Sequence, residues 1–312
     1  MLMAQWLTRS RLLIITFGLA IALGGACNCD DDPDPDPDDV GVNDVEDDVD
    51  DNDVDDDNDV EDDVDDNDVD IPEGMARIQV VHEAADPGAD GIDVYLDDEL
   101  TIEDFEFRTA TPFLDVDAET YDIAIAPGDS ESADDAVATF EDISLEDGER
   151  YLVVASGVLD TDEFDANPDG IDIELALYIL DNAREVADDE GFDEVVLFHG
   201  ATDAPAVDVE VDDQVLVDAL AYGNFTDGYL SLPPGNTMFD LVVSDTGDTI
   251  ATYETPSLEG GDTWVGVASG FLDDDQNPDA PFEVVIYPTP VDGERLDATI
   301  LEVVDDDDDD DD

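Results

Sequence analysis

The two histidines are the first residues of this chain that could do chemistry. His82 and His199 are its only histidines, and each ends an apolar run ahead of an alternating segment. A catalytic base needs a partner, but the chain has no nearby cysteine and no G-x-S-x-G nucleophile motif. A single histidine beside Glu83 or Asp203 also makes a thin set of metal ligands. We therefore expect one duplicated structural role for the histidines, with a metal-ligand role as the alternative.

A second candidate for chemistry is a loop with the opening spacing of a calcium site. Its oxygen-bearing side chains are Asp165, Asn167, Asp169 and Asp172. Gly170 completes the pattern D-x-N-x-D-G, in which side-chain oxygens converge on a hard cation. The glutamate expected at the twelfth position is absent, because Ala176 stands there. Two interpretations stay open: a weak calcium site, and a type I turn made by Asn-Pro-Asp-Gly. We predict no other cofactor.

The segments that hold these residues occur twice. RIQVVHEAADPGADGIDVYLD (77–97) corresponds to VVLFHGATDAPAVDVEVD (195–212), and ERYLVVASGVLD (149–160) corresponds to DTWVGVASGFLD (262–273). The Asn-Pro-Asp sequence of the candidate loop also recurs, at residues 277–279. With a period of about 110 residues, the duplicated unit is a whole domain rather than a solenoid repeat.

Each copy is predicted to consist of strands. VDVEVD (207–212) alternates apolar and acidic residues with the period of a half-buried strand, and IDVYLD (92–97) does the same. YLVVASG (151–157) is apolar on both faces, as a central strand covered on both sides would be. Turn residues recur at a spacing typical of a sandwich or barrel rather than of β-α-β units. The predicted fold class is all-β, with two tandem antiparallel, Ig-like β-sandwich domains at residues 74–190 and 191–304.

The second copy carries motifs that resemble those of a known family. ATDAPAVDV (201–209), FTDGYL (225–230) and the strand TWVGVASG (263–270) together resemble the uncharacterised family called domain of unknown function 4397. The resemblance covers residues 75–304 and includes both copies, although the first has GADGIDV (88–94) in place of the Ala-Pro segment. It implies a β-sandwich found in exported bacterial and archaeal proteins, often in tandem, and it implies no catalytic residue.

The N-terminus has the three parts of an export signal. Arg9 and Arg11 precede the apolar run 12–23, and small residues lead to Cys27. The pattern predicts a signal peptide at residues 1–26. It resembles a bacterial lipoprotein signal, so Cys27 is the predicted lipidation site and the membrane is a partner through that lipid. Plain secretion and an uncleaved anchor are the alternatives. We expect the protein to be exported, either lipid-anchored in the cell envelope or secreted.

Acidic residues dominate the composition. The chain has 93 Asp and Glu against only 7 basic residues, all of them arginine. Residues 27–73 are a predicted disordered spacer, because isolated valines among dense like charges cannot build a core, and residues 305–312 are a poly-Asp tail. Such a chain repels nucleic acid, which we exclude as a partner. Its self-repulsion is screened by salt, which favours a protein of a salt-adapted organism; a very soluble surface protein is the alternative.

These features predict a non-enzymatic exported module, tethered to the membrane, with a binding or envelope-structural role. One alternative is a cation-dependent adhesin or glycan-binding protein, for which Tyr222, Phe225 and Tyr229 are the candidate aromatic platform. Another alternative is a hydrolase of unknown substrate, whose acid and base cannot be chosen among so many carboxylates. The expected partner beyond the membrane is a cell-envelope polymer or glycan, and the oligomeric state stays open.

Overall fold

The computed structural model describes residues 70–273, 275–289 and 293–304, and all of them belong to one compact unit. The predicted signal peptide, most of the predicted spacer and the poly-Asp tail lie outside the described residues. The described residues form strands and two short 3₁₀ helices, η1 (Pro87–Ala89) and η2 (Ala133–Asp135). Neither helix has the length or the apolar composition that crossing a membrane requires. The all-β prediction is therefore confirmed.

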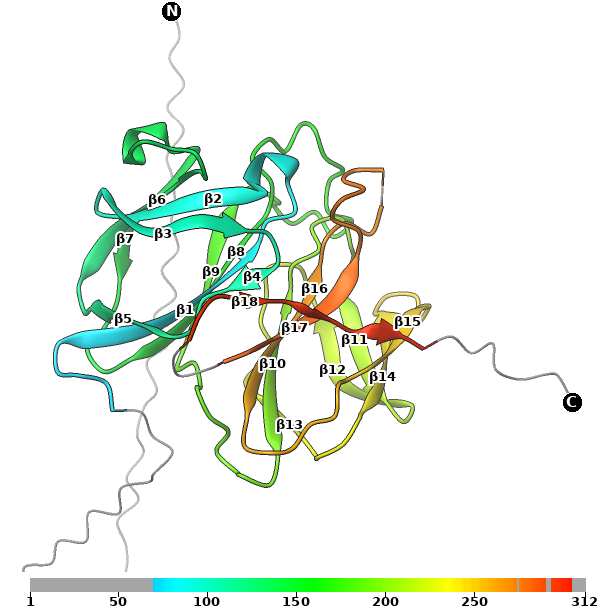
Figure 1. The fold of residues 1–312 in the computed structure, drawn as a ribbon. Coiled ribbons are helices and arrows are strands. Elements are labelled where there is room, and N and C mark those ends of the chain that lie inside the picture. Colours follow the sequence, from blue (N-terminus) through cyan, green and yellow to red (C-terminus); the bar gives the residue numbers. More distant parts are fainter. Residues whose placement is uncertain (1–69, 274, 290–292, 305–312) are drawn as a thin grey trace, which may run out of the picture. The chain divides into compact units, whose positions relative to one another are not determined.

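Repeat 1 consists of two sheets built from the first nine strands (Figure 1). Its outer sheet has the order β3-β2-β6-β7, with bounds β2 (Gly91–Leu96), β3 (Glu99–Glu106), β6 (Thr120–Pro127) and β7 (Ala138–Ser144). In its inner sheet β1 lies between β8 and the short strands β4 and β5, and β9 follows β8. The bounds are β1 (Met75–Glu83), β4 (Thr109–Ala110), β5 (Leu114–Asp117), β8 (Arg150–Ser156) and β9 (Ala176–Asp181).

Repeat 2 has the same arrangement. Its outer sheet includes β12-β11-β14-β15, with bounds β11 (Val207–Val211), β12 (Gln214–Leu220), β14 (Met238–Val243) and β15 (Thr249–Glu254). Its inner sheet includes β13-β10-β16-β17, with bounds β10 (Asp193–His199), β13 (Leu230–Leu232), β16 (Thr263–Ser269) and β17 (Glu283–Pro288). The matching strand orders confirm the predicted tandem repeat of one sandwich domain.

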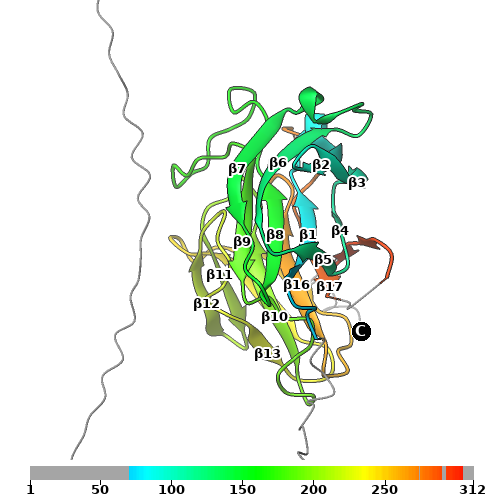
Figure 2. The same ribbon diagram turned by 90° about the vertical axis from the view of Figure 1, so that its left-hand side faces the viewer.

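The prediction of purely antiparallel sandwiches needs one correction. In each inner sheet the first strand of the repeat runs parallel to a later central strand, β1 beside β8 and β10 beside β16 (Figure 2). The physical reason is that these partners are far apart in sequence, so no hairpin turn dictates their direction. The parallel registers also place the two histidines at equivalent positions of the repeats, since His82 pairs with Ala155 and His199 pairs with Ala268.

The two inner sheets pack against each other. A buried cluster between them takes side chains from both repeats, including Val81, Val154, Phe198, Val267 and Tyr287. We call this contact region the seam. The name includes the loops at its ends and the linker between β9 and β10. It explains the unusually apolar central strands, since β8 faces the core of repeat 1 on one side and the seam on the other. Each repeat has its own separate core between its two sheets.

The C-terminal segment crosses from one repeat to the other, which the sequence did not indicate. β18 (Leu296–Asp297) pairs with β4 of repeat 1. β19 (Thr299–Ile300) then pairs with β17, and β20 (Glu302–Val303) pairs with β15. Leu301, between these last two strands, is buried in the core of repeat 2. The segment therefore covers one edge of the repeat 2 sandwich and joins both repeats.

Candidate functional site in the seam between the repeats

Both histidines are fully buried at matching ends of β1 and β10. His82 Nε2 lies 2.6 Å from the carbonyl oxygen of Ala89, and His199 Nε2 lies 3.0 Å from that of Pro205. Because a carbonyl only accepts, each ring donates its Nε2–H. Burial lowers the pKa of His82 to about 4 and also lowers the pKa of His199, so both rings are neutral at pH 7. Two neutral buried rings in equivalent contacts agree with a duplicated structural role.

A carboxylate after each histidine holds the loop that follows the Ala-Ser-Gly strand. Asp86 accepts the backbone N–H of Leu159 at 2.7 Å. Asp203 accepts the N–H groups of Leu272 and Asp273, each at 2.8 Å. Each of these bonds lies within one repeat, so the Asp residues set the course of the two loops that meet at the seam.

The two Asn-Pro-Asp loops reach across the seam in opposite directions. Asn167 of repeat 1 donates from its side-chain amide to the carbonyls of Thr202 (2.8 Å) and Ala204 (3.1 Å) in repeat 2. Asn277 of repeat 2 donates to the carbonyl of Ala85 in repeat 1 at 2.8 Å. Both asparagines are buried. Each loop is thereby bonded to the segment that follows the histidine of the other repeat.

The predicted calcium residues Asn167 and Asp169 take part in this contact. Asn167 Oδ1 accepts the N–H of Asp169 at 2.9 Å, and its backbone carbonyl accepts the N–H of Gly170, as in an Asn-initiated turn. Asp169 Oδ2 accepts the N–H of Ala206 in repeat 2 at 2.8 Å. These bonds give both side chains a role in joining the repeats.

The other two predicted ligands, Asp165 and Asp172, lie in the same loop with different partners. The backbone N–H of Asp165 donates to the side chain of Gln276 at 2.7 Å, and the Asp172 carboxylate accepts the N–H of Glu174 at 3.1 Å. Across residues 70–273, 275–289 and 293–304, no three His, Cys, Asp or Glu side chains are grouped as a metal ion would require. The weak calcium site stays a prediction, which a calcium titration in high monovalent salt would test.

The linker between the repeats places two opposite charges side by side. Glu185 pairs with Arg77 at 2.7 Å and with Arg150 at 2.8 Å, both from repeat 1. Arg184 instead pairs with Glu194 of repeat 2 at 2.5 Å. Arg77 and Glu194 stand at equivalent positions, each five residues before a histidine. The pairing is therefore reversed in sign between the repeats, and the linker is bonded to both.

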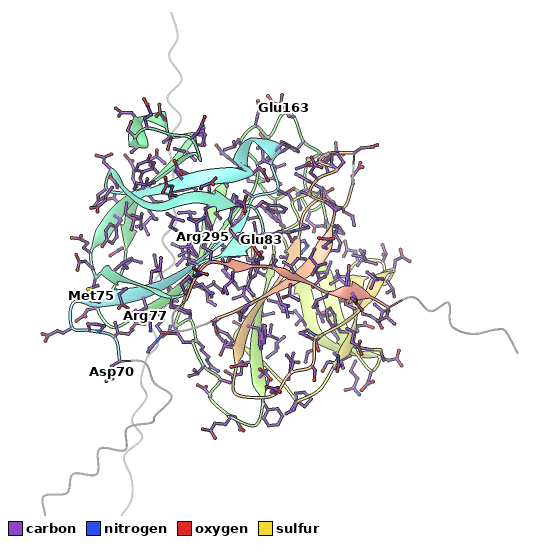
Figure 3. All side chains as sticks on the ribbon, in the orientation of Figure 1. Asp70, Met75, Arg77, Glu83, Glu163 and Arg295 are labelled. Carbon is purple, nitrogen blue, oxygen red and sulfur yellow. The ribbon has the colours of Figure 1, made fainter. Side chains whose placement is uncertain are left out.

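A further cluster of polar side chains lies at the C-terminal end of β1. Glu83 is fully buried and accepts a hydrogen bond from the hydroxyl group of Tyr287 in repeat 2. Beside it, Arg108 forms an ion pair with Glu283 and donates from Nε to Ser269 Oγ at 2.9 Å. Burial raises the pKa of Glu83 to about 7, and this effect exceeds the opposing effects of Ser269, Tyr287 and Arg108. Figure 3 shows Glu83 and Arg77 near opposite ends of the same strand.

All five arginines among the described residues bond acidic side chains or backbone carbonyls. Arg77, Arg150 and Arg184 bond acidic groups at the linker, and Arg108 spans the seam. Arg295 of the C-terminal segment donates to backbone carbonyls of repeat 1 and lies over the ring of Phe105. No pattern in the sequence singles out these residues. Their scarcity was the available signal, because the chain has only 7 cations among 93 acidic residues and a buried carboxylate needs a paired cation.

The three candidate residues of a glycan platform have packing contacts in the structure, where Tyr222 is buried and Phe225 and Tyr229 are half-buried. Tyr222 is buried with its ring edge-on to His199, and Phe225 packs on Phe198 with the ring centres 4.8 Å apart. The Tyr229 hydroxyl accepts the backbone N–H of Arg184 at 2.9 Å. These contacts use the three rings for packing, and a glycan platform built on them stays a prediction.

The fold and the seam define a class of protein in which two copies of one β-sandwich domain are joined through their inner sheets. The family described as domain of unknown function (DUF4397) matches residues 76–169 and 194–284, which is more than half of the chain. The protein belongs to this family and contains two copies of its domain. No curated protein matches the chain.

One solved structure similar to this chain is described as "Alpha-glucan binding by a streptococcal virulence factor". It is 13% identical over 69% of this chain and 97% of that chain, with a TM-score of 0.20. A TM-score this low supports no conclusion about fold or function.

Proposed function

We propose that this protein is a non-enzymatic, exported surface module that is tethered to the membrane at Cys27 and binds a component of the cell envelope. In this proposal the acidic spacer holds the paired domains away from the membrane, as like charges keep a chain extended. The paired domains act as one rigid unit, because a linker ion-pair network, two asparagine contacts and a C-terminal strand all join them.

One observation carries the non-enzymatic part of the proposal. The groups best suited to acid–base chemistry are buried and engaged in structural contacts: His82, His199 and Glu83 each have 0% of their surface exposed. A substrate would have to displace these packed contacts to reach them. Four of the five described arginines pair with acidic side chains at the seam, and the surface is rich in carboxylates. Such a surface suits a solvated, salt-tolerant protein that engages neutral or cationic partners.

The export and tether are tested by mass spectrometry of the mature protein from the producing cells. We expect cleavage before Cys27 and an acyl-modified cysteine at the new N-terminus. The matched variant Cys27→Ser should leave the membrane fraction and appear outside the cell or in the soluble envelope fraction. An unmodified N-terminus at Met1, or an unchanged membrane fraction for Cys27→Ser, would contradict the tether.

The binding role is tested with the soluble Cys27→Ser protein and isolated cell envelope, in high salt to screen non-specific attraction. We expect saturable binding and no release of small fragments from the envelope. Addition of calcium distinguishes a cation-dependent adhesin from a cation-independent module. Release of sugars or peptides by the pure protein would instead favour the hydrolase alternative.

A further inference from the structure

The seam has an approximate two-fold symmetry that fails at one place. Tyr287 of repeat 2 corresponds to Tyr178 of repeat 1, as the fourth residue of the matched segments 175–180 and 284–289. Glu83, which contacts Tyr287, corresponds to Gly200, since each directly follows a histidine. Arg108 corresponds to Gly223, because their backbone N–H groups donate to the carbonyls of the two histidines.

The two halves of the seam therefore differ in charge. Around Tyr178 the corresponding positions are glycines, and a Cβ on Gly223 would lie 2.6 Å from the Tyr178 ring. Around Tyr287 the same positions carry a carboxyl group and a guanidinium group. Ionisable side chains occupy only one half of an otherwise matched contact, so backbone geometry does not require them there.

Glu83 faces few charges from the elements around it. Arg108 comes from the turn between β3 and β4, and Tyr287 and Glu283 come from β17. The neutral hydroxyl of Ser269 comes from β16, and β8 contributes the neutral Ser156. The guanidinium of Arg108 already pairs with Glu283. An ionised Glu83 would thus place a second carboxylate beside one cation in a site closed to water.

We propose that Glu83 is a pH-sensitive contact between the repeats: the neutral carboxyl group favours the closed seam, and its ionisation weakens it. This inference does not depend on the proposed function, because it concerns only the contact between the two domains.

The direction of the effect follows from burial. The pKa of Glu83 is raised from its ordinary value of 4.5 to about 7 in the folded protein, mainly by loss of hydration. A group with a raised pKa contributes stability that is fully present below its unfolded pKa and is lost as the pH rises through its folded pKa. The pKa of Tyr287 is also raised, so its hydroxyl stays protonated and remains the donor across this range.

The variant Glu83→Gln keeps the size and acceptor oxygen of the side chain and removes its titration. We expect the unfolding equilibrium constant of the intact protein to rise on the order of 100-fold more than that of Glu83→Gln between about pH 5 and about pH 9. Equilibrium urea unfolding at constant high salt measures this difference. Equal pH profiles for the two proteins would overturn the proposal.

Glu283→Gln is the matched control, since it removes the other carboxylate of the same cluster. Its side chain is 28% exposed and pairs with Arg108, so its loss should lower stability without removing the Glu83-dependent step in the pH profile. If Glu83→Gln does not fold, infrared spectroscopy of the wild-type protein provides the test. A protonated carboxyl band from a buried glutamic acid should persist above pH 6 and disappear in alkali. Its absence at pH 6 would also overturn the proposal.

Discussion

One face of the outer sheet of repeat 1 is covered by the segment between β6 and β7. The matching face of repeat 2 has only a short turn between β14 and β15 there. In repeat 1, Tyr95 is only 4% exposed, because it packs with Ala124 and Ala126 under the segment that contains η2. Its hydroxyl lies 2.8 Å from Ser130 Oγ in that segment. In repeat 2 the equivalent residue is Glu210, and a short turn replaces the covering segment. The two outer sheets therefore share a strand order but differ in the segment that covers one face.

The interiors of the repeats also differ. The cavity between the sheets is about 80 Å³ in repeat 2 and about 40 Å³ in repeat 1. Val153 of repeat 1, which lines the smaller cavity, corresponds to Gly266 in repeat 2. Leu197, which faces the larger cavity, remains partly exposed. Repeat 1 is thus the better packed copy, and the comparison can be sharpened by substitutions at matched positions.

The largest effect is expected at the linker, where the repeats pair with opposite charges. Arg77→Met removes a buried partner of Glu185 and should lower the free energy of unfolding by about 3 kcal/mol, because a buried carboxylate loses part of its compensation. Arg184→Met should cost about 1 kcal/mol, since Arg184 is 34% exposed. Urea denaturation measures both. A larger loss for Arg184→Met would reverse our ranking of the two sides.

The covered outer sheet supplies an effect of similar size. Tyr95→Ala should lower stability by about 3 kcal/mol, because it removes a buried ring and leaves a space under the η2 segment. Glu210→Ala, at the matching position of repeat 2, should change stability by less than about 0.5 kcal/mol. Thermal unfolding of both variants checks the contrast. Similar losses would show that the outer sheets are not treated differently.

The reciprocal asparagine contacts give a smaller contrast. Asn167→Ala leaves two buried carbonyls without their donor and should cost about 2 kcal/mol, whereas Asn277→Ala leaves one and should cost about 1 kcal/mol. The double variant should lose the sum if the two contacts act independently. A loss well below that sum in the urea midpoint would mean that one contact depends on the other.

The smallest effect is expected inside repeat 2. A Cβ on Gly266 would lie 2.6 Å from Leu197 Cδ2, the flexible end of a side chain that can move into the adjacent cavity. Gly266→Ala should therefore change stability by less than about 1 kcal/mol, with a gain from the reduced freedom of the unfolded chain offsetting the displacement of Leu197. A calorimetric loss of several kcal/mol would show that the cavity cannot accept the movement.

Much of the fold could be predicted from the sequence, because it depends on local patterns that occur twice. Alternating residues at 92–97 and 207–212 became paired strands, and the apolar segment 151–157 became a central strand covered on both faces. The two histidines also lie at the same end of the equivalent strands β1 and β10. Local periodicity determines which residues face a core. Because each pattern occurs twice, one copy supports the strand assigned to the other.

The contacts that join the repeats were decided only by the tertiary structure. No local pattern indicates that Asn167 bonds the backbone of repeat 2, that Glu83 meets Tyr287, or that residues 296–303 pair with strands of both repeats. These partners are up to 204 residues apart, and their meeting depends on which sheet faces pack together. Asn167 and Asp169, which suggested a cation site by their spacing, are a donor and an acceptor between the domains. Spacing determined the types of atoms available, and packing determined what they bond.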